Sequence, residues 1–357
     1  MRRFEVNRQE YSDWRVADYE PSTLGEGEVR LAIDFFSFTA NNMTYAAAGD
    51  FLGYWKFFPV EPEDGFGVIP VWGFAEVIES RCDEVGLGER LYGYFQPAGE
   101  LIIKPINVSG GTLFDGTDHR QELPPLYNQY QRIPDGGGTG VAGRLQALLG
   151  PLYMTGYSIW DQLAVNNYYD ADQIVVVSAS SKTSIGLAEA LALDEAAPKV
   201  VGLTSAGNVD FVKGLGIYDE VVSYDSIHSL NSASVVVVDM AGNAETAQNL
   251  RDHFGDNLQY FISVGLTHWD KAGGAMGGAP EDKHEMFFAP SYILERSKAL
   301  GPREYNRRLQ AFMEKATSKA SSWLTLKEVD NVNALGELYS DVCAGSMDPS
   351  EGIICKF

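Results

Sequence analysis

Residues 173–225 read QIVVVSASSKTSIGLAEALALDEAAPKVVGLTSAGNVDFVKGLGIYDEVVSYD, and this stretch decides the fold. Three apolar runs in it, rich in β-branched residues, are typical of buried strands. They lie at residues 174–178, 199–205 and 220–225. Two segments typical of helices separate them, at residues 179–193 and 208–216. This alternation of strand and helix predicts a parallel sheet with crossover helices.

The turn after the first strand, SASSKTSIG at residues 178–186, leads into a helix. Free N–H groups and the helix dipole favour a phosphate there. Dinucleotide-binding turns usually read G-x-G-x-x-G, because glycines let the backbone approach the pyrophosphate. Here only Gly186 remains, and hydroxyl residues and Lys182 fill the other positions. Such side chains bind phosphate but are also ordinary turn and capping residues, so a phosphate site and a plain turn both stay open.

Composition limits the classes of protein that the chain can represent. Its 357 residues, 45% of them hydrophobic, predict two domains with substantial cores. The sequence has no apolar run long enough for a membrane span and no apolar segment of a secretory signal near Met1. The net charge of −22 argues against nucleic acid or an anionic membrane as a partner. The three cysteines are far apart and form no disulfide framework, which favours a cytoplasmic protein.

Four short patterns follow one another in the first hundred residues. They are L-x-x-GEV-x-L at residues 24–31, N-x-x-x-Y-x-x-x-G at 41–49, G-x-A-x-V-x-x-S at 73–80 and G-x-R-x-x-G at 88–93. In these patterns the chain resembles the medium-chain dehydrogenase/reductase superfamily, and in particular its zinc-independent branch of quinone oxidoreductases and enoyl reductases. It is also similar to a subgroup, described only as a domain of unknown function, that carries the S-A-S-S-K-T turn.

The resemblance implies an α/β fold in which a Rossmann-type, doubly wound parallel sheet is inserted into a GroES-like β-barrel catalytic domain. The catalytic domain would comprise residues 1–148 and 320–357, and the nucleotide-binding domain residues 149–319. The family also implies a cofactor in the cleft between the domains and a homodimer that pairs the nucleotide-domain sheets.

Zinc members of the superfamily need a cysteine at the start of the first helix, where this chain has Met43 and Thr44. We therefore expect no catalytic metal. The second strand of the nucleotide domain ends in Thr204 and Ser205 rather than in the acidic residue typical of NAD enzymes, which favours NADP. The expected function is a zinc-independent, NADPH-dependent reduction of a quinone, enone or enoyl thioester by direct hydride transfer. The alternative is a non-redox lyase or ligand-binding protein whose nucleotide site is lost or repurposed.

Candidate catalytic residues come from the N-x-x-x-Y pattern: Asn41, Asn42 and Tyr45. Hydride transfer builds negative charge on the substrate oxygen, which amide and hydroxyl donors stabilise. The competing interpretation is that the asparagines cap a helix expected from Met43 and that Tyr45 is buried. The candidate cofactor-binding residues follow strand ends or match family positions: Thr155, Ser180, Ser181, Lys182, Thr183, Thr204, Ser205, Asn208, Tyr224, Met240, Ala241, Gly242, Val264, Gly265, Leu266 and Phe288.

Residues 100–150 are longer and richer in glycine, proline and tyrosine than the family's usual connection. Long irregular segments in compact proteins are often functional. This segment is expected either to line the substrate pocket, with His119, Tyr127, Asn128 and Tyr130, or to be an excursion over the surface.

Overall fold

The computed structural model describes residues 1–60, 64–264 and 283–356. The chain divides into two compact units. The first comprises Met1–Leu148 and Leu324–Phe357, and the second comprises Leu149–Trp323. The sequence analysis expected the second junction at residues 319 and 320, slightly before the observed one. No helix among the described residues has both the length and the apolar character that crossing a membrane requires.

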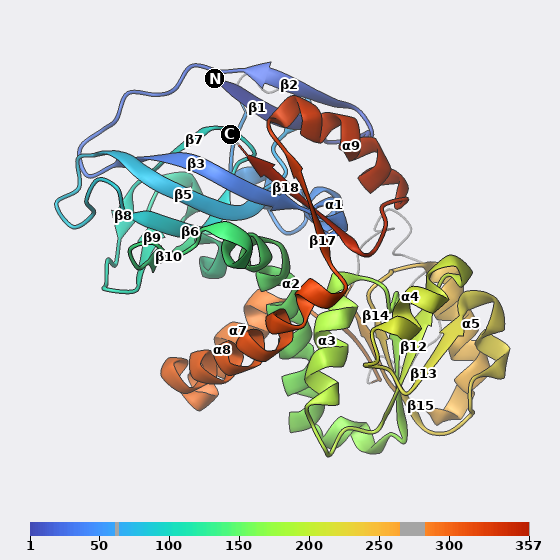
Figure 1. Cartoon of the computed structure of the whole chain (residues 1–357). Coiled ribbons are helices and arrows are strands. Elements are labelled where there is room, and N and C mark those ends of the chain that lie inside the picture. The colour runs from blue at the N-terminus through green and yellow to red at the C-terminus, as the bar shows by residue number, and fades with distance from the viewer. Residues whose placement is uncertain (61–63, 265–282, 357) are drawn as a thin grey trace. The chain divides into compact units, whose positions relative to one another are not determined.

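The second unit is built on a six-stranded sheet in the order β13-β12-β11-β14-β15-β16, and every neighbouring pair is parallel (Figure 1). The strands are β11 (Gln173–Val177), β12 (Lys199–Thr204), β13 (Glu220–Ser223), β14 (Val235–Asp239), β15 (Leu258–Ser263) and β16 (His284–Met286). This is the strand order of a Rossmann fold. The order reverses between β11 and β14, so ligands are expected at the carboxyl ends of these strands.

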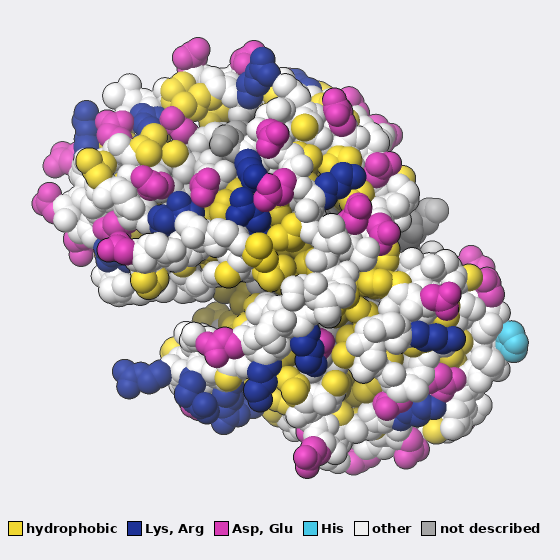
Figure 2. Space-filling view, in the orientation of Figure 1, with side chains coloured by type: hydrophobic (Ala, Val, Ile, Leu, Met, Phe, Trp, Pro, Cys, Tyr) yellow, Lys and Arg dark blue, Asp and Glu magenta, His cyan; other side chains and the backbone are white. Residues whose placement is uncertain are grey.

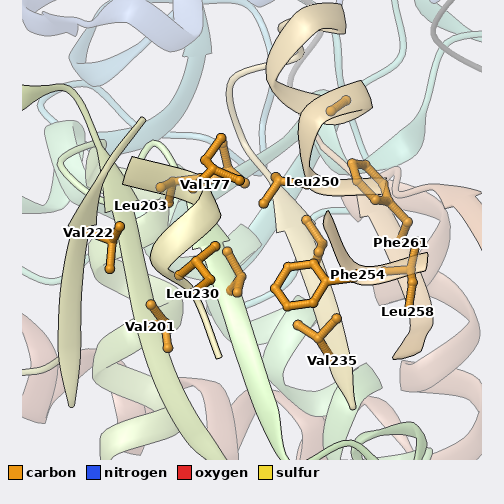
Figure 3. Close-up of a cluster of buried hydrophobic side chains, with 14 residues drawn as sticks. Val177, Val201, Leu203, Val222, Leu230, Val235, Leu250, Phe254, Leu258 and Phe261 are labelled. Atoms are coloured by element: carbon orange, nitrogen blue, oxygen red, sulfur yellow. The ribbon is translucent and has the colours of Figure 1, made fainter. Parts of the chain in front are cut away.

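Apolar side chains on both faces of this sheet are buried, as the continuous apolar runs predicted. Along β11, Val175 and Val177 point into one core, while Ile174 and Val176 point into the other. The first core includes Leu250 and Phe254 of α5 (Ala244–Phe254), as Figure 3 shows. Among the described residues, the α-helices of this unit besides α5 are α2 (Gly140–Val165, whose first residues belong to the other unit), α3 (Lys182–Ala192), α4 (Val209–Gly214), α7 (Ala289–Leu300) and α8 (Pro302–Ser318).

The first unit contains a large sheet in the order β17-β18-β3-β5-β6-β10-β9-β8, with β7 also paired to β3, and a small sheet in the order β2-β1-β4 (Figure 1). The strands before residue 100 are β1 (Arg2–Asn7), β2 (Trp14–Asp18), β3 (Val29–Phe38), β4 (Phe66–Gly67), β5 (Val71–Ser80) and β6 (Arg90–Phe95). The remaining strands are β7 (Glu100–Ile103), β8 (Pro105–Ile106), β9 (Thr112–Asp115), β10 (Gln129–Ile133), β17 (Thr325–Val329) and β18 (Glu351–Lys356).

The end of the chain completes the first unit. Strand β18 pairs antiparallel with β3, with Ile354 opposite Ser37, and helix α9 (Val332–Ala344) packs its Tyr339 against Phe4 and Phe38. The second unit is therefore inserted between two parts of one sheet. This arrangement confirms the expected fold class.

Residues 100–150 are not irregular. They form β7 to β10, two short 3-10 helices, η2 (Asp118–Arg120) and η3 (Pro125–Asn128), and the start of α2. Strand β10 pairs with both β6 and β9, so the segment extends the large sheet. Tyr127, Asn128 and Tyr130 are buried, and the interpretation of a surface excursion is wrong for them.

Candidate functional site

The turn after β11 keeps a conformation that normally requires glycine. Ser178 has a φ of 59°, in the left-handed region, which costs a residue with a Cβ about 1–2 kcal/mol. It is the first residue after β11, at the point where the chain turns toward α3. Three residues further on, Ser181 caps α3 by accepting a hydrogen bond from the backbone N–H of Ser184. The path from strand to helix therefore combines a left-handed residue with a side-chain cap.

Ser180, Thr204 and Asn208 meet at this turn. The Oγ of Ser180 lies 3.3 Å from Thr204 Oγ1 and 3.1 Å from Asn208 Nδ2, which donates to it. Ser180 and Thr204 are buried, and Asn208 is half-buried. The sequence analysis assigned all three to the cofactor, and the structure brings them together. In this arrangement their polar atoms bind one another across the carboxyl ends of β11 and β12.

The other predicted residues of this edge surround the turn. Lys182 and Thr183 open α3 and are half-buried, and Ser205 is exposed directly after β12. Tyr224 begins η6 (Tyr224–Ser229), and its phenol interacts with Ser178. Burial raises the pKa of its phenol, and the contact with Ser178 opposes this. Residues from three successive strand ends therefore border the serine turn.

Gly186 serves helix packing. A Cβ at this position of α3 would lie 2.7 Å from the ring of Tyr153 in α2. Gly156 of α2 faces it in turn, because a Cβ there would lie 2.5 Å from the backbone nitrogen of Leu187. The last glycine of a dinucleotide-binding turn has the same role of allowing close packing.

Asp239 organises the end of β14. Its carboxylate accepts the backbone N–H groups of Ala241, at 2.8 Å, and Gly242, at 3.1 Å. Its backbone carbonyl accepts the N–H of Val264. Asp239 is only 3% exposed, and this burial raises its pKa. These contacts bring the predicted residues Ala241, Gly242 and Val264 together, with Met240 between β14 and Ala241.

Three further predictions for this unit have different outcomes. Thr155 donates its hydroxyl to the carbonyl of Pro151 within α2. Phe288 is the residue before α7 and is half-buried. Gly265 and Leu266 lie outside the described residues. The structure does not test whether Thr155 and Phe288 contact a cofactor, so these roles stay predictions.

Helix α1 (Ala40–Ala47) begins earlier than expected, so Asn41 and Asn42 lie inside its first turn instead of preceding it. The capping residue is Thr39, which accepts from the N–H of Asn41. Asn42 completes a capping box by accepting from the N–H of Thr39, and it donates to the carbonyl of Pro70 at 2.8 Å. The buried amide of Asn42 therefore has the capping role of the competing interpretation, and its predicted catalytic role stays a prediction.

Tyr45 points into the first unit and is 6% exposed. Its hydroxyl oxygen accepts the indole N–H of Trp72 at 3.1 Å. Burial raises the pKa of Tyr45 to about 12, and interactions with Trp72, Asn41 and Tyr94 oppose this rise. Because the oxygen accepts from Trp72, the proton of Tyr45 is directed toward another partner. This arrangement fits a proton or hydrogen-bond donor.

Three further tyrosines gather around Tyr45. They are Tyr54 of η1 (Tyr54–Lys56), Tyr94 of β6 and Tyr127 of η3. The hydroxyls of Tyr54 and Tyr127 lie 3.0 Å apart. Among these three, Tyr127 was predicted as a candidate, because it lies in residues 100–150. Nothing in the sequence marks Tyr94, because a tyrosine in a strand is ordinary.

A buried ion pair holds the segment that carries Tyr127. Arg120 is 1% exposed and pairs with Asp115, which is 4% exposed, at 3.0 Å. Arg120 also donates to the hydroxyl of Tyr130, which in turn donates to the carbonyl of Tyr94. His119 contacts the carbonyl of Phe57, and burial lowers its pKa. Within the described ranges, no three His, Cys, Asp or Glu side chains gather in a group that could hold a metal ion.

A family model described as "Protein of unknown function (DUF2855)" matches residues 36–348. The match covers most of the chain. The chain belongs to the DUF2855 family. No curated protein matches it.

Solved structures share the fold of this DUF2855 chain at low sequence identity. CurA from Vibrio vulnificus, in complex with NADPH, has 13% identity and a TM-score of 0.59, with 100% of this chain and 99% of that chain covered. The quinone oxidoreductase of Escherichia coli, complexed with NADPH, has 12% identity and a TM-score of 0.58, with 100% of both chains covered. The complex of Etr1p with NADP and crotonyl-CoA has 13% identity and a TM-score of 0.57, covering 100% and 99%. At these identities the likeness shows the fold, a GroES-like part with an inserted Rossmann domain.

Proposed function

We propose that the chain is an NADPH-dependent oxidoreductase that reduces an activated carbonyl compound by direct hydride transfer, without zinc. One observation carries the proposal: Ser178, the first residue of the turn between β11 and α3, adopts a left-handed backbone conformation that normally requires glycine. A residue with a Cβ holds this conformation only where the surroundings enforce it, and such strain gathers at functional sites. The same turn leads to the N-terminus of α3, a favourable place for a pyrophosphate.

The residues around the turn fit such a cofactor. Lys182, Thr183 and Ser181 would bind the pyrophosphate, and Ser205 and Asn208 the 2′-phosphate. Tyr224 would border the adenosine. The loops after β14 and β15, with Ala241, Gly242 and Val264, would approach the nicotinamide. No acidic residue ends β12, so nothing there repels a 2′-phosphate.

The bound cofactor would supply the hydride, and residues of the first unit would donate hydrogen bonds to the oxygen of the substrate. Negative charge develops on that oxygen as the hydride arrives, and a neutral donor stabilises it. Tyr45 is such a donor, since the indole N–H of Trp72 occupies the acceptor side of its hydroxyl. Asn41 is half-buried beside it and would orient the carbonyl group.

The substrate class follows from the surroundings of Tyr45 and from the fold relatives. Aromatic rings of Tyr54, Trp72 and Tyr127 surround the phenol, and they suit a flat, apolar molecule. The relatives include a quinone oxidoreductase and a protein bound to crotonyl-CoA. Quinones, enones and enoyl thioesters are therefore the substrates to test.

A specific observation favours the second candidate, a non-redox protein with a repurposed nucleotide site. Ser180, Thr204 and Asn208 already satisfy one another, so a phosphate would have to replace these hydrogen bonds. Each replaced bond lowers the net gain in binding free energy by about 1 kcal/mol.

Titration with NADPH and with NADH, followed by cofactor fluorescence, separates the two candidates. The reductase should bind NADPH in the micromolar range and more tightly than NADH. Lys182→Ala should weaken NADPH binding by about 1–3 kcal/mol if its ammonium group meets a phosphate, while Lys213→Ala, on exposed α4, should leave it unchanged. Absence of binding by either cofactor would favour the non-redox protein.

Turnover supplies the second part of the test. NADPH oxidation should be followed with quinones, enones and enoyl thioesters, before and after dialysis against a chelator. Unchanged rates after dialysis are expected of a zinc-independent enzyme, whereas a loss of activity that zinc restores would contradict that part of the proposal. Light scattering during size-exclusion chromatography would test the homodimer that we also propose.

A further inference from the structure

Four tyrosines that reach one another from separate elements form a cluster in the first unit, which we call the tyrosine box: Tyr45, Tyr54, Tyr94 and Tyr127. The ring centroids of Tyr45 and Tyr54 lie 4.7 Å apart, and those of Tyr94 and Tyr127 lie 4.6 Å apart. Tyr45 also meets Tyr94 edge-on at 5.5 Å. Tyr45, Tyr54 and Tyr127 are 4–6% exposed and Tyr94 is fully buried. Three residues of the box therefore have a small solvent-exposed fraction.

The hydroxyl groups of the box carry protons that are not used in hydrogen bonds within it. One proton joins Tyr54 to Tyr127, and a second remains on this pair. Tyr45 accepts from Trp72, so its own proton points elsewhere. The buried hydroxyl of Tyr94 interacts with the hydroxyl of Tyr45 but makes no hydrogen bond of good geometry to any residue that the structure describes. A buried hydroxyl without a partner costs about 1–3 kcal/mol, and an acceptor bound in the box would remove that cost.

The phenolic groups are close enough to influence one another. Burial raises the pKa of Tyr94 well above its usual value, and the neighbouring phenols of Tyr45, Tyr127 and Tyr54 raise it further. Burial has the same effect on the pKa of Tyr54 and Tyr127. All four groups therefore remain neutral donors across the physiological pH range.

A buried cation lies near the box. Arg120 donates to the hydroxyl of Tyr130, which donates to the backbone carbonyl of Tyr94, and the charge of Arg120 opposes the rise in the pKa of Tyr94. Asp115 forms an ion pair with Nη1 of Arg120, while Nη2 of Arg120 has no hydrogen-bond partner in the described part of the chain. The aromatic walls, the spare protons and this guanidinium group all favour a flat ligand that carries negative charge on oxygen.

The geometry points to an oxyanion-binding site: the tyrosine box binds the oxygen of a flat, apolar carbonyl compound in its enolate or phenolate form. Tyr54, Tyr94 and Tyr127 are thereby hydrogen-bond donors to the substrate oxygen, as Tyr45 is. Arg120 is a positioning residue that acts through Tyr130 and the strand of Tyr94. The inference rests on the proposed function for the substrate class, and it narrows that class to compounds whose reduction passes through such an anion.

The test uses 4-nitrophenol without any nicotinamide cofactor. Absorbance of its phenolate, recorded as a function of pH with and without the full-length protein, gives the ionisation of the bound probe. Binding should shift this ionisation to lower pH, because the box donates hydrogen bonds to the anion. 4-Nitroanisole has the same ring but cannot form a phenolate, so it should bind at least about tenfold more weakly at neutral pH.

Tyr94→Phe and Tyr127→Phe should each weaken phenolate binding about tenfold and change the affinity for 4-nitroanisole less than twofold. Tyr339→Phe is the matched control, since Tyr339 is a buried tyrosine of the same unit whose hydroxyl donates to the carbonyl of Tyr11. It should leave phenolate binding unchanged. An unshifted ionisation of the probe in the wild-type protein would overturn the inference, and so would equal affinities for the two probes.

The wild-type measurements need no substitution, so a variant that fails to fold does not decide the outcome. They also stand apart from the test of the proposed function. A protein that binds phenolate but neither NADPH nor NADH would lose the reductase assignment and keep the site. A protein that binds NADPH but not phenolate would lose only the site.

Discussion

Ser178 shows how one residue can hold a backbone conformation that its type disfavours. The G-x-G-x-x-G pattern is recognisable only at Gly186, yet Ser178, the first residue of the turn, adopts a left-handed conformation that usually needs glycine. Tyr224 contacts Ser178 and helps to fix it. The left-handed conformation crowds a Cβ against the following carbonyl oxygen, so tertiary contacts must hold it.

Substitution of Ser178 tests this conformation. Ser178→Val should lower the free energy of unfolding by about 2 kcal/mol or more, because a β-branched side chain tolerates positive φ poorly. Ser178→Gly should stay within about 1 kcal/mol of the wild type, since relief of strain offsets the entropy of the unfolded chain. Urea denaturation measures both. Ser205→Val, at an exposed and extended residue, is the control, and an equal loss there would contradict the assigned backbone.

Asp239 should make stability depend on pH. Burial raises its native pKa, so the unfolded chain loses the proton first and stability falls as pH rises from about 4 toward the native pKa. Asp239→Asn keeps the acceptor for Ala241 and Gly242 but cannot ionise. We expect the variant to gain stability relative to the wild type over that range, as measured by denaturation at several pH values. Asp256→Asn, at an exposed site, is the control, and parallel profiles for Asp239→Asn and the wild type would argue against a raised pKa.

At the scale of elements, helices α2 and α3 approach each other closely through two glycines. Glycine inside a helix costs about 1 kcal/mol relative to alanine, so its presence in both helices needs a packing reason. Gly156 faces the backbone of α3 and Gly186 faces Tyr153. The close approach fixes the start of α3, and with it the turn that carries Ser180 to Thr183.

Gly156→Ala should destabilise the protein by about 3 kcal/mol, because the added Cβ would force the backbone of α3 to move. Thermal unfolding measures the loss. Gly214→Ala in α4 is the matched control, since nothing lies within 4 Å of a Cβ there, and helix propensity should make this variant neutral or slightly more stable. Tolerance of alanine at Gly156 would show that the two helices have room to separate.

At the scale of the whole molecule, the main feature is an excess of negative charge. The net charge is −22, and Figure 2 shows acidic side chains scattered over the visible face of each unit. Basic side chains gather over α7 and α8, where α8 carries Arg303, Arg307 and Arg308 (Figure 2). Glu304 pairs with the last two, so even this region is partly neutralised.

Repulsion among the acidic groups should make stability depend on salt. Raising NaCl from 10 mM to about 0.5 M shortens the Debye length from about 30 Å to less than 10 Å, which should raise the midpoint of thermal unfolding. KCl at the same ionic strength is the control and should give the same rise. A midpoint that stays constant or falls would show that attractive ion pairs outweigh the repulsion.

The sequence by itself determined the parallel sheet, the inserted domain and the strand ends where ligands are expected. These features depend on local patterns, namely apolar runs, turns and helical stretches, and on the order of short motifs along the chain. Local pattern also singled out Tyr45 and the serine turn as candidate site residues. It misplaced the start of α1 by overlooking Thr39 as a cap, and it treated residues 100–150 as irregular although β9 and β10 extend the sheet.

Only the tertiary structure decided which side chains share a site. Ser180 meets Thr204 and Asn208 because parallel strands end at one edge, and the tyrosine box assembles from four elements spread between residues 45 and 127. Such contacts depend on register and packing between distant segments, and the types of the contacting residues do not reveal them. For the same reason, the commitment of Asn42 to a capping box and the spare hydroxyl of Tyr94 could be read only from the folded chain.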